Sequence, residues 1–116
     1  MINLDQETAF TQRMLDTIAV RTRVAMHNLA NQNTPGFKAH RVRFEELLQD
    51  AQHSGKDPGE VHPEIYRDDS GGPGVNNVAP MEELAILDKV RLLHEVFARR
   101  AGGYFNKLNS AIRGRV

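Results

Sequence analysis

The sequence has no cysteine, few aromatic residues and no excess of either charge. Without cysteine, the 116-residue chain can hold no disulfide framework, no cysteine-ligated zinc and no thiol nucleophile. Only 6% of its residues are aromatic and 40% are hydrophobic, which predicts a single small domain with a modest core. The 15 basic and 15 acidic residues cancel, so the broad positive field typical of a nucleic-acid binder is missing.

The sequence also lacks the long apolar runs that mark membrane spans and secretory signals. No stretch approaches the length needed to cross a bilayer. The first seven residues, from Met1 to Glu7, contain no basic residue and no long apolar run. We therefore expect no cleaved signal peptide.

Motifs for catalysis, cofactors and metals are missing as well. His94 and Glu95 begin like the His-Glu-x-x-His helix of zinc proteases, but Ala98 stands where the second histidine would be. The glycine-rich run at 71–74 lacks the lysine and hydroxyl residue of a phosphate loop, and its proline removes an amide donor. We predict no catalytic residue, no bound cofactor and no metal site.

A first amphipathic helix is predicted from about Gln6 to Asn31. Apolar and small side chains recur there at alternating spacings of three and four residues, as on a helix that docks along one face. The stripe consists of Leu15, Ile18, Thr22, Ala25 and Leu29. At a rise of 1.5 Å per residue this helix would be about 39 Å long, a rod rather than an ordinary core helix.

A second helix is predicted from about Glu82 to Arg113, with the stronger pattern of the two. Acidic residues near its start and basic residues near its end match the polarity of the helix dipole. Gly102 and Gly103 interrupt it at a cost of roughly 1–2 kcal/mol relative to alanine, which indicates a kink, a close helix approach or two tolerated glycines. Its apolar stripe consists of Ile86, Val90, Leu93, Phe97, Ala101, Tyr104 or Phe105, Leu108 and Ile112.

These elements divide one domain into an N-terminal helical arm (1–33), a centre (34–79) and a C-terminal helical arm (80–116). The centre is acidic, gathers most of the glycines and prolines, and contains a short predicted helix at 44–48. We expect the rest of it to be loops that are partly flexible. The predicted fold class is all-α, with the two long helices pairing as a coiled-coil-like unit. Because their seams are rich in alanine and polar residues, we expect partner helices to complete the burial.

The most specific stretch lies at the end of the first helix. Pro35 disfavours helical geometry at Thr34, and Gly36 can take the positive φ of a type II turn. We therefore predict that the helix ends near Asn31 to Asn33 and that the turn redirects the chain, with Phe37 as an apolar anchor. The stretch reads Asn28-Leu29-Ala30-Asn31-Gln32-Asn33-Thr34-Pro35-Gly36-Phe37-Lys38.

This stretch resembles the N-terminal signature of the flagellar rod, hook and hook-associated axial proteins. In that family a helix ends in Asn-(Leu/Ile)-Ala-Asn-x-x-Thr-Pro-Gly-(Tyr/Phe)-Lys. The chain lacks the large inserted domain of hook and distal-rod members, and the runs at 76–78 and 104–115 look like those of a proximal rod protein. Three features depart from the family pattern: Phe37 in place of the commoner tyrosine, the pair Gln32-Asn33, and Gly102-Gly103. A closely related proximal rod protein stays open as an alternative.

The resemblance implies a structural subunit of the bacterial flagellar basal-body rod in the periplasmic space. Such a subunit is exported by the flagellar type III apparatus and polymerises through its terminal helices into a torque-transmitting shaft. The implied partners are other copies, other rod subunits, FliE, MS-ring components and the export apparatus. The residues of the implied turn are Asn28, Leu29, Ala30, Asn31, Thr34, Pro35, Gly36, Phe37 and Lys38. The residues expected to pack in the helix pair and the assembly are Leu15, Ile18, Ala25, Leu29, Val90, Leu93, Phe97, Phe105, Leu108 and Ile112.

A small helical module that binds nucleic acid or another partner is the alternative from a different class. Arg41 and Arg43 follow Lys38, and the second helix is basic toward its end. Solvated charge that complements the helix dipole is the favoured explanation of these residues. The acidic centre would oppose the approach of phosphate, so the structural reading is favoured.

Overall fold

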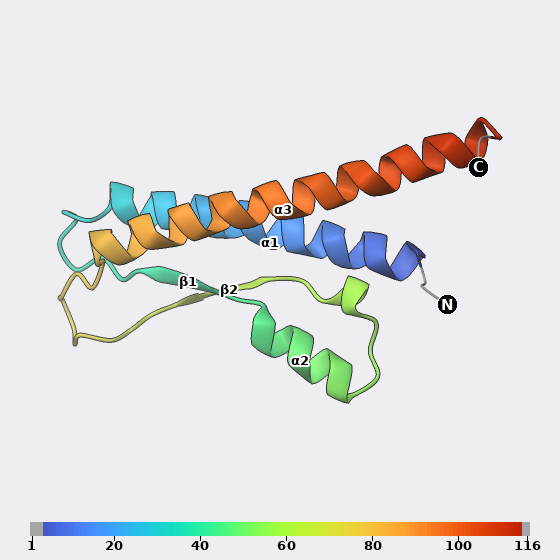
Figure 1. The fold of residues 1–116 in the computed structure, drawn as a ribbon. Helices are drawn as coiled ribbons and strands as arrows, with labels where there is room; N and C mark the ends of the chain where they lie inside the picture. The colour runs from blue at the N-terminus through green and yellow to red at the C-terminus, as the bar shows by residue number, and fades with distance from the viewer. Residues whose placement is uncertain (1–3, 115–116) are drawn as a thin grey trace.

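The computed structural model describes residues 4–114. Its elements are α1 (Leu4–Ala30), β1 (His40–Arg43), α2 (Glu45–His53), the 3-10 helix η1 (Pro58–Glu60), β2 (Glu64–Arg67) and α3 (Pro80–Ile112). The long helices α1 and α3 lie side by side and run antiparallel, while the segment between them packs mainly on α1 (Figure 1). The molecule is elongated, with principal extents of 62 × 30 × 15 Å.

Both long helices lie where the sequence pattern predicts them, within two residues at each end. Pro80 occupies the first turn of α3, where its missing amide removes no helical hydrogen bond. Glu82 and Glu83 follow it at the positive end of the helix dipole. α3 continues through Gly102 and Gly103, and a Cβ at either glycine would meet no atom within 4 Å. Close approach within the chain is therefore not the reason for these two glycines.

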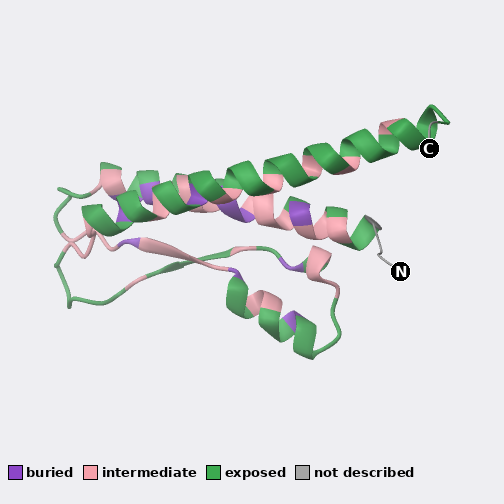
Figure 2. Cartoon of the chain, viewed as in Figure 1, coloured by how far each residue is buried: buried purple, intermediate pink, exposed green. Residues whose placement is uncertain are grey.

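The interface between α1 and α3 is narrow. Ile18 and Ala25 of α1 and Val90 of α3 are buried at its centre. Farther along, the rings of Phe10 and Phe97 meet edge to face with centroids 6.4 Å apart. Most of the α3 surface that points away from α1 is exposed (Figure 2). The helix pair thus buries little more than one stripe of α3.

A second apolar cluster holds the centre of the chain against α1. Phe44, Ala51 and Val61 are buried in it, and the half-buried side chains of Met14, Leu47 and Leu48 pack around them. Because Met14 belongs to α1 and the other five residues belong to the centre, this cluster docks α2 and its neighbours onto the long helix. α1 is consequently the element that both small cores share.

The all-α prediction is wrong for part of the centre. β1 and β2 form an antiparallel pair in which His40 lies opposite Arg67 and Arg43 lies opposite Glu64. In addition, η1 was not predicted, and α2 continues to His53 instead of stopping at residue 48. The strands have only four residues each, and β2 is exposed on both faces. The sequence therefore lacks the alternation of apolar and polar residues that would predict them.

We predict that a methyl group at Gly59 will separate η1 from α1. A Cβ there would lie 2.6 Å from the Cβ of Ala9, so Gly59→Ala should lower the free energy of unfolding by about 1–3 kcal/mol in urea titrations followed by circular dichroism. Gly102→Ala is the matched control, because open space surrounds that position and alanine favours the helix by up to about 1 kcal/mol. Equal stability of the two variants would show that the Gly59 contact is not tight.

Candidate functional site

The end of α1 and the two segments that flank the hairpin meet in a corner built largely from asparagine side chains. Asn28 is fully buried and faces the first residue of β1. Its Nδ2 donates to the carbonyl of His40 at 2.9 Å, and its Oδ1 accepts from the amide of His40 at 3.0 Å. One side-chain amide therefore occupies the place of a neighbouring strand and sets the direction in which the chain leaves the corner.

The predicted turn is present. Gly36 has a φ of +74°, and the amide of Phe37 donates to the carbonyl of Thr34 at 3.2 Å. Pro35 and Gly36 thus take the two central positions of a four-residue turn, as the sequence predicts. Asn31 closes the helix end, since its Oδ1 accepts from the Thr34 hydroxyl at 3.1 Å.

The motif residue Phe37 contacts the last turn of α1. Its ring lies 5.6 Å from that of His27 in an edge-to-face arrangement, which agrees with its predicted role as an anchor after the turn. Lys38, the last residue of the motif, donates from Nζ to the carbonyls of Ser70 at 3.0 Å and Gly72 at 2.5 Å. This lysine therefore ties the glycine-rich run of the centre back to the turn.

Asn76 belongs to the corner, although the sequence gave it only a place in the family resemblance and no structural role. Its Nδ2 donates to the carbonyls of Asn31 at 2.9 Å and Thr34 at 2.8 Å, which lie just beyond the end of α1 and also accept backbone amides of the turn. Its own Oδ1 accepts from the amide of Val78 at 2.9 Å, just before α3 begins. Asn76 therefore links the end of one long helix to the approach of the other.

Asn77 extends the hairpin by one further rung. Its Oδ1 accepts from the amide of Ala39 at 2.7 Å, and its Nδ2 donates to the carbonyl of Asp68 at 2.7 Å. Ala39 and Asp68 precede β1 and follow β2, where the chains begin to diverge. The amide of Asp68 also donates directly to the carbonyl of Ala39 at 2.8 Å, so the Asn77 side chain pairs the two backbone groups of this residue pair that face away from that bond.

The carboxylate of Asp68 helps to shape the same loop. It accepts from the amide of Ser70 at 3.0 Å, and hydrogen bonds from Ser70 hold the pKa of Asp68 below its ordinary value. The nearby charges of Arg41 and Lys38 act in the same direction. Asp68 consequently stays ionised and available as an acceptor over the physiological pH range.

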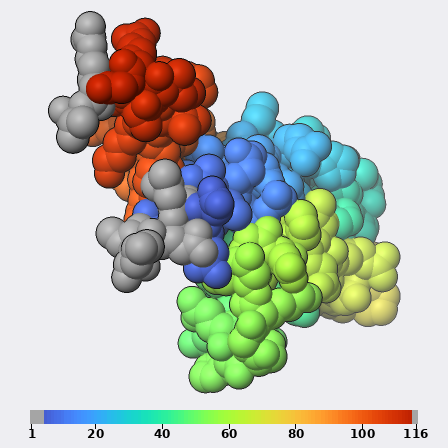
Figure 3. Space-filling view, turned by 90° about the vertical axis from the view of Figure 1, so that its right-hand side faces the viewer, coloured from blue at the N-terminus to red at the C-terminus, as the bar shows by residue number. Residues whose placement is uncertain are grey.

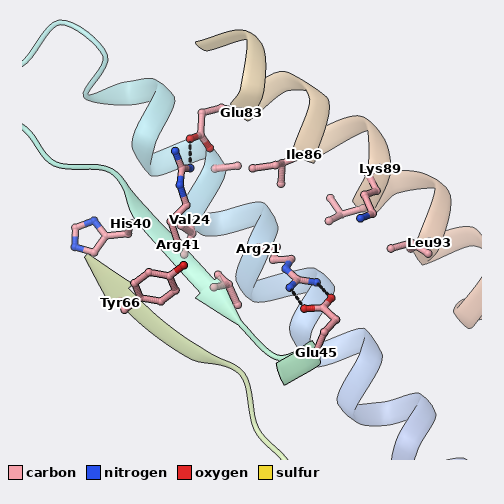
Figure 4. A pocket seen from close by; sticks show the side chains of 13 residues that line it. Arg21, Val24, His40, Arg41, Glu45, Tyr66, Glu83, Ile86, Lys89 and Leu93 are labelled. Atoms are coloured by element: carbon pink, nitrogen blue, oxygen red, sulfur yellow. Dashed lines mark hydrogen bonds and ion pairs between the residues drawn. The ribbon is translucent and has the colours of Figure 1, made fainter. Parts of the chain in front are cut away.

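Two ion pairs border a cavity of about 310 Å³ between α1, β1 and α3 (Figure 4). Arg41 of β1 donates from Nη1 to Oε1 of Glu83 at 2.5 Å, and Glu83 is fully buried in the first turn of α3. Arg21 of α1 makes a two-pronged contact with Glu45 at 2.7 and 2.5 Å, and this hydrogen bonding lowers the pKa of Glu45. These charges join the centre to both long helices.

The cavity offers little for catalysis. Its two carboxylates, of Glu83 and Glu45, are each paired with an arginine, and most of the remaining lining is aliphatic. Among residues 4–114, no group of three or more histidine, cysteine, aspartate or glutamate side chains could hold a metal ion. The arrangement is suited to joining elements rather than to binding a reactive ligand.

The structure distributes the ten predicted packing residues over three environments. Ile18, Ala25 and Val90 are buried. The half-buried ones are Leu15, Leu29, Leu93 and Phe97, and the exposed ones are Phe105, Leu108 and Ile112. The space between α1 and α3 is lined by Leu15, Ile18, Ala25, Val90, Leu93 and Phe97, whereas the exposed group lies at the end of α3.

Comparison with known proteins gives one partial likeness. No protein-family model matches the chain. The flagellar basal body rod protein FlgB of Aeromonas hydrophila is 38% identical to it over 52 residues. The chain is similar to a rod protein. The alignment covers 45% of this chain and 39% of the FlgB sequence, so it spans less than half of either protein.

Within the part of the chain that the structure describes, no helix combines the length and the apolar character needed to cross a bilayer.

We predict that the Asn28 amide is required for the corner. Asn28→Ala should lower the free energy of unfolding by about 2–4 kcal/mol, because it leaves both backbone groups of His40 without their partner in a buried place. The neighbouring Asn33→Ala, at an exposed position, should change stability by no more than about 0.5 kcal/mol. Amide hydrogen exchange at His40 gives the direct readout, and unchanged protection in Asn28→Ala would contradict the assignment.

We also predict that the backbone of Gly36 excludes branched side chains. Gly36→Val should destabilise the protein by about 1–3 kcal/mol, since valine tolerates a φ of +74° poorly. Gly36→Asn should cost clearly less, because asparagine enters this left-handed region more readily. Thermal unfolding of the two variants compares them, and equal losses would mean that the space around Gly36 matters rather than its φ.

Proposed function

We propose that the chain is a structural subunit of the bacterial flagellar basal-body rod, of the FlgB type. The observation that carries this proposal is the match between the family signature and the corner at 28–38, together with the likeness to FlgB. In this proposal the corner holds α1 and α3 antiparallel, and the two helices polymerise with those of neighbouring subunits. The role is structural, with no catalytic step and no cofactor.

The end of α3 supports assembly through the terminal helices. Tyr104 donates to Glu7 of α1 at 3.0 Å, near the start of that helix. Beyond this contact Phe105, Leu108 and Ile112 are 65%, 52% and 75% exposed. Figure 3 shows the end of α3 on the side of α1 that is opposite α2. Apolar side chains left open in this way favour burial against other subunits.

The flank of the helix pair adds further apolar surface. One groove of about 590 Å³ is lined by residues that include Leu15, Ala19 and Leu87, and a second of about 260 Å³ is lined by Leu15, Ala101 and Phe105 among others. Leu15 borders both, so the grooves follow one another along α1. Helices of neighbouring subunits would fill them.

The total accessible surface agrees with a subunit that buries more area on assembly. The described structure exposes 8063 Å². A compact monomer of this mass is expected to expose roughly 6,400 Å², so the excess is about 1,700 Å². One partner of a standard protein interface buries roughly 800 Å², so that excess is about the area that two such interfaces would take from one chain.

The proposed partners are further copies of the chain, other rod subunits, FliE and MS-ring components, with the flagellar export apparatus delivering the subunit without a cleaved signal. The proposed location is the rod in the periplasmic space. FlgC, the closely related proximal rod protein, is the alternative within the family. Nothing in the described structure favours the nucleic-acid alternative. Arg41, a candidate for contacting phosphate, forms an ion pair with Glu83 instead.

We predict that an aspartate at the end of α3 will block rod assembly without unfolding the subunit. Phe105→Asp replaces a side chain that is already 65% exposed, so circular dichroism should show an unchanged helix content while motility and intact basal bodies are lost. The matched control Asn106→Asp adds the same charge at the next exposed position and should assemble normally. In the helix interface, Leu93→Asp or Phe97→Asp should abolish assembly as well.

Two results separate the possible outcomes. Normal swimming of cells that carry Phe105→Asp would refute the role of this surface in assembly. Normal swimming of cells in which the gene is deleted would refute the rod function itself.

A further inference from the structure

The groove between α1 and α3 is long enough to hold a third helix. Its two parts are the cavities of about 590 Å³ and 260 Å³ that share Leu15, and only α1 and α3 line them. Along α1 the lining extends from Thr8 to Arg23, which corresponds to about 22 Å of helix. A helix of about 15 residues would match this length.

Charge lines only one end of the groove, and it is positive. The larger part is lined by Arg23, Arg91 and His94 beside apolar side chains, with no carboxylate among its lining residues. The smaller part has no charged side chain in its lining. Because Arg23 and Arg91 are exposed, their guanidinium groups border the open side of an otherwise apolar groove. This combination favours a partner that is apolar with acidic flanks.

Arg23 differs from the other two arginines of α1 in having no acidic partner. Arg13 pairs with Asp16, and Arg21 pairs with Glu45. Arg23 takes part in no ion pair among residues 4–114. Between Asp16 and Glu45 the sequence contains no acidic residue, so α1 offers Arg23 no carboxylate within one turn. A carboxylate of another molecule can therefore pair with Arg23 without displacing one of this chain.

Arg91, on the opposite side of the groove, adds less positive charge than Arg23. Asp88 and Glu95 lie about one turn away from it along α3, and they offset part of its field. Even so, no ion pair within residues 4–114 includes Arg91. Arg23 is consequently the residue that we expect to select the charge of a partner.

The exposed apolar surfaces of this chain do not match the groove in charge. After Glu95 the sequence has no acidic residue, so the exposed end of α3 carries only basic charge. The outer side of α3 mixes Asp88 and Glu95 with Arg91 and Arg99, all within about 80° around the helix. The acidic helix α2 packs its own leucines in the cluster on α1. Charge thus favours a helix of another protein over a second copy.

We propose that this groove is the docking site of an amphipathic helix from a different protein, whose apolar stripe is flanked by acidic side chains that pair with Arg23. Burial of the stripe supplies affinity, and the arginine selects the charge of the partner. The inference rests on the proposed function in one respect, since the helix would then belong to a neighbouring rod subunit of another sequence.

Two synthetic helices test the charge preference. Both are peptides of about 18 residues with the same stripe of leucine and alanine, stapled on the far face to stay helical. Glutamate flanks the stripe in one and lysine in the other. Fluorescence anisotropy with the full chain should give a Kd at least about tenfold lower for the glutamate peptide at low salt, and added salt should reduce this ratio. The formal net charge of the chain is zero, so the preference reports local charge.

Three variants locate the binding site. Arg23→Glu should weaken binding of the glutamate peptide about fivefold and strengthen binding of the lysine peptide. Arg99→Glu is the matched control, because it makes the same change at an exposed arginine that points about 130° away from the groove. Ala19→Trp places a bulky side chain at an exposed lining position and should weaken both peptides at least about tenfold. Circular dichroism should show unchanged helix content in all three.

The contrary results are equally defined. Equal affinity for the two peptides, or no binding of either at millimolar concentration, would refute the acidic partner. A preference that survives both Arg23→Glu and Ala19→Trp would refute this groove as the site. Self-association of the chain that Arg23→Glu abolishes would show that a second copy fills the groove instead. None of these results bears on the rod function, which gene deletion tests separately.

Discussion

The hydrogen bonds that asparagine side chains make to the backbone are the interaction on which the rest of this structure depends. At the corner the main chain leaves a helix, turns and enters a strand within ten residues, so several amides and carbonyls lose their regular partners. Leaving such a group unpaired in a buried place costs about 1–3 kcal/mol. Asn28, Asn76 and Asn77 pair these groups, and both long helices meet at the corner that results.

The parts of the fold that could be predicted are those with a local physical cause. The two long helices follow from the period of their apolar residues, and the positive φ of Gly36 follows from the steric freedom of glycine after proline. The hairpin could not be predicted, because four-residue strands exposed to solvent carry no alternating pattern. Ile65 and Tyr66 give a weak signal, since β-branched and aromatic residues favour strands.

Only the first part of the corner, the turn that follows α1, could be predicted from the sequence. The motif at 28–38 indicates a turn, but the groups that complete it lie 38 to 45 residues farther along the chain. No spacing rule connects such positions. Periodicity also predicted a single apolar face for α3. A second apolar stripe on its other side, formed by Met81, Leu92 and Val96, was missed because Asp88 and Arg99 interrupt it. The exposure of each side chain in the folded chain is what reveals that stripe.

α3 is held at its start by the corner and along much of its length by α1, and its last turns extend beyond these contacts. The ion pair between Arg41 and Glu83 and the hydrogen bonds of Asn76 fix the first turns of this helix, while Phe105, Leu108 and Ile112 in its last turns are exposed. The helix is about 50 Å long, so a tilt of a few degrees at the corner moves its far end by several ångströms. A small rearrangement of the asparagine contacts would therefore change the spacing of the two helix ends far more than it changes the corner itself.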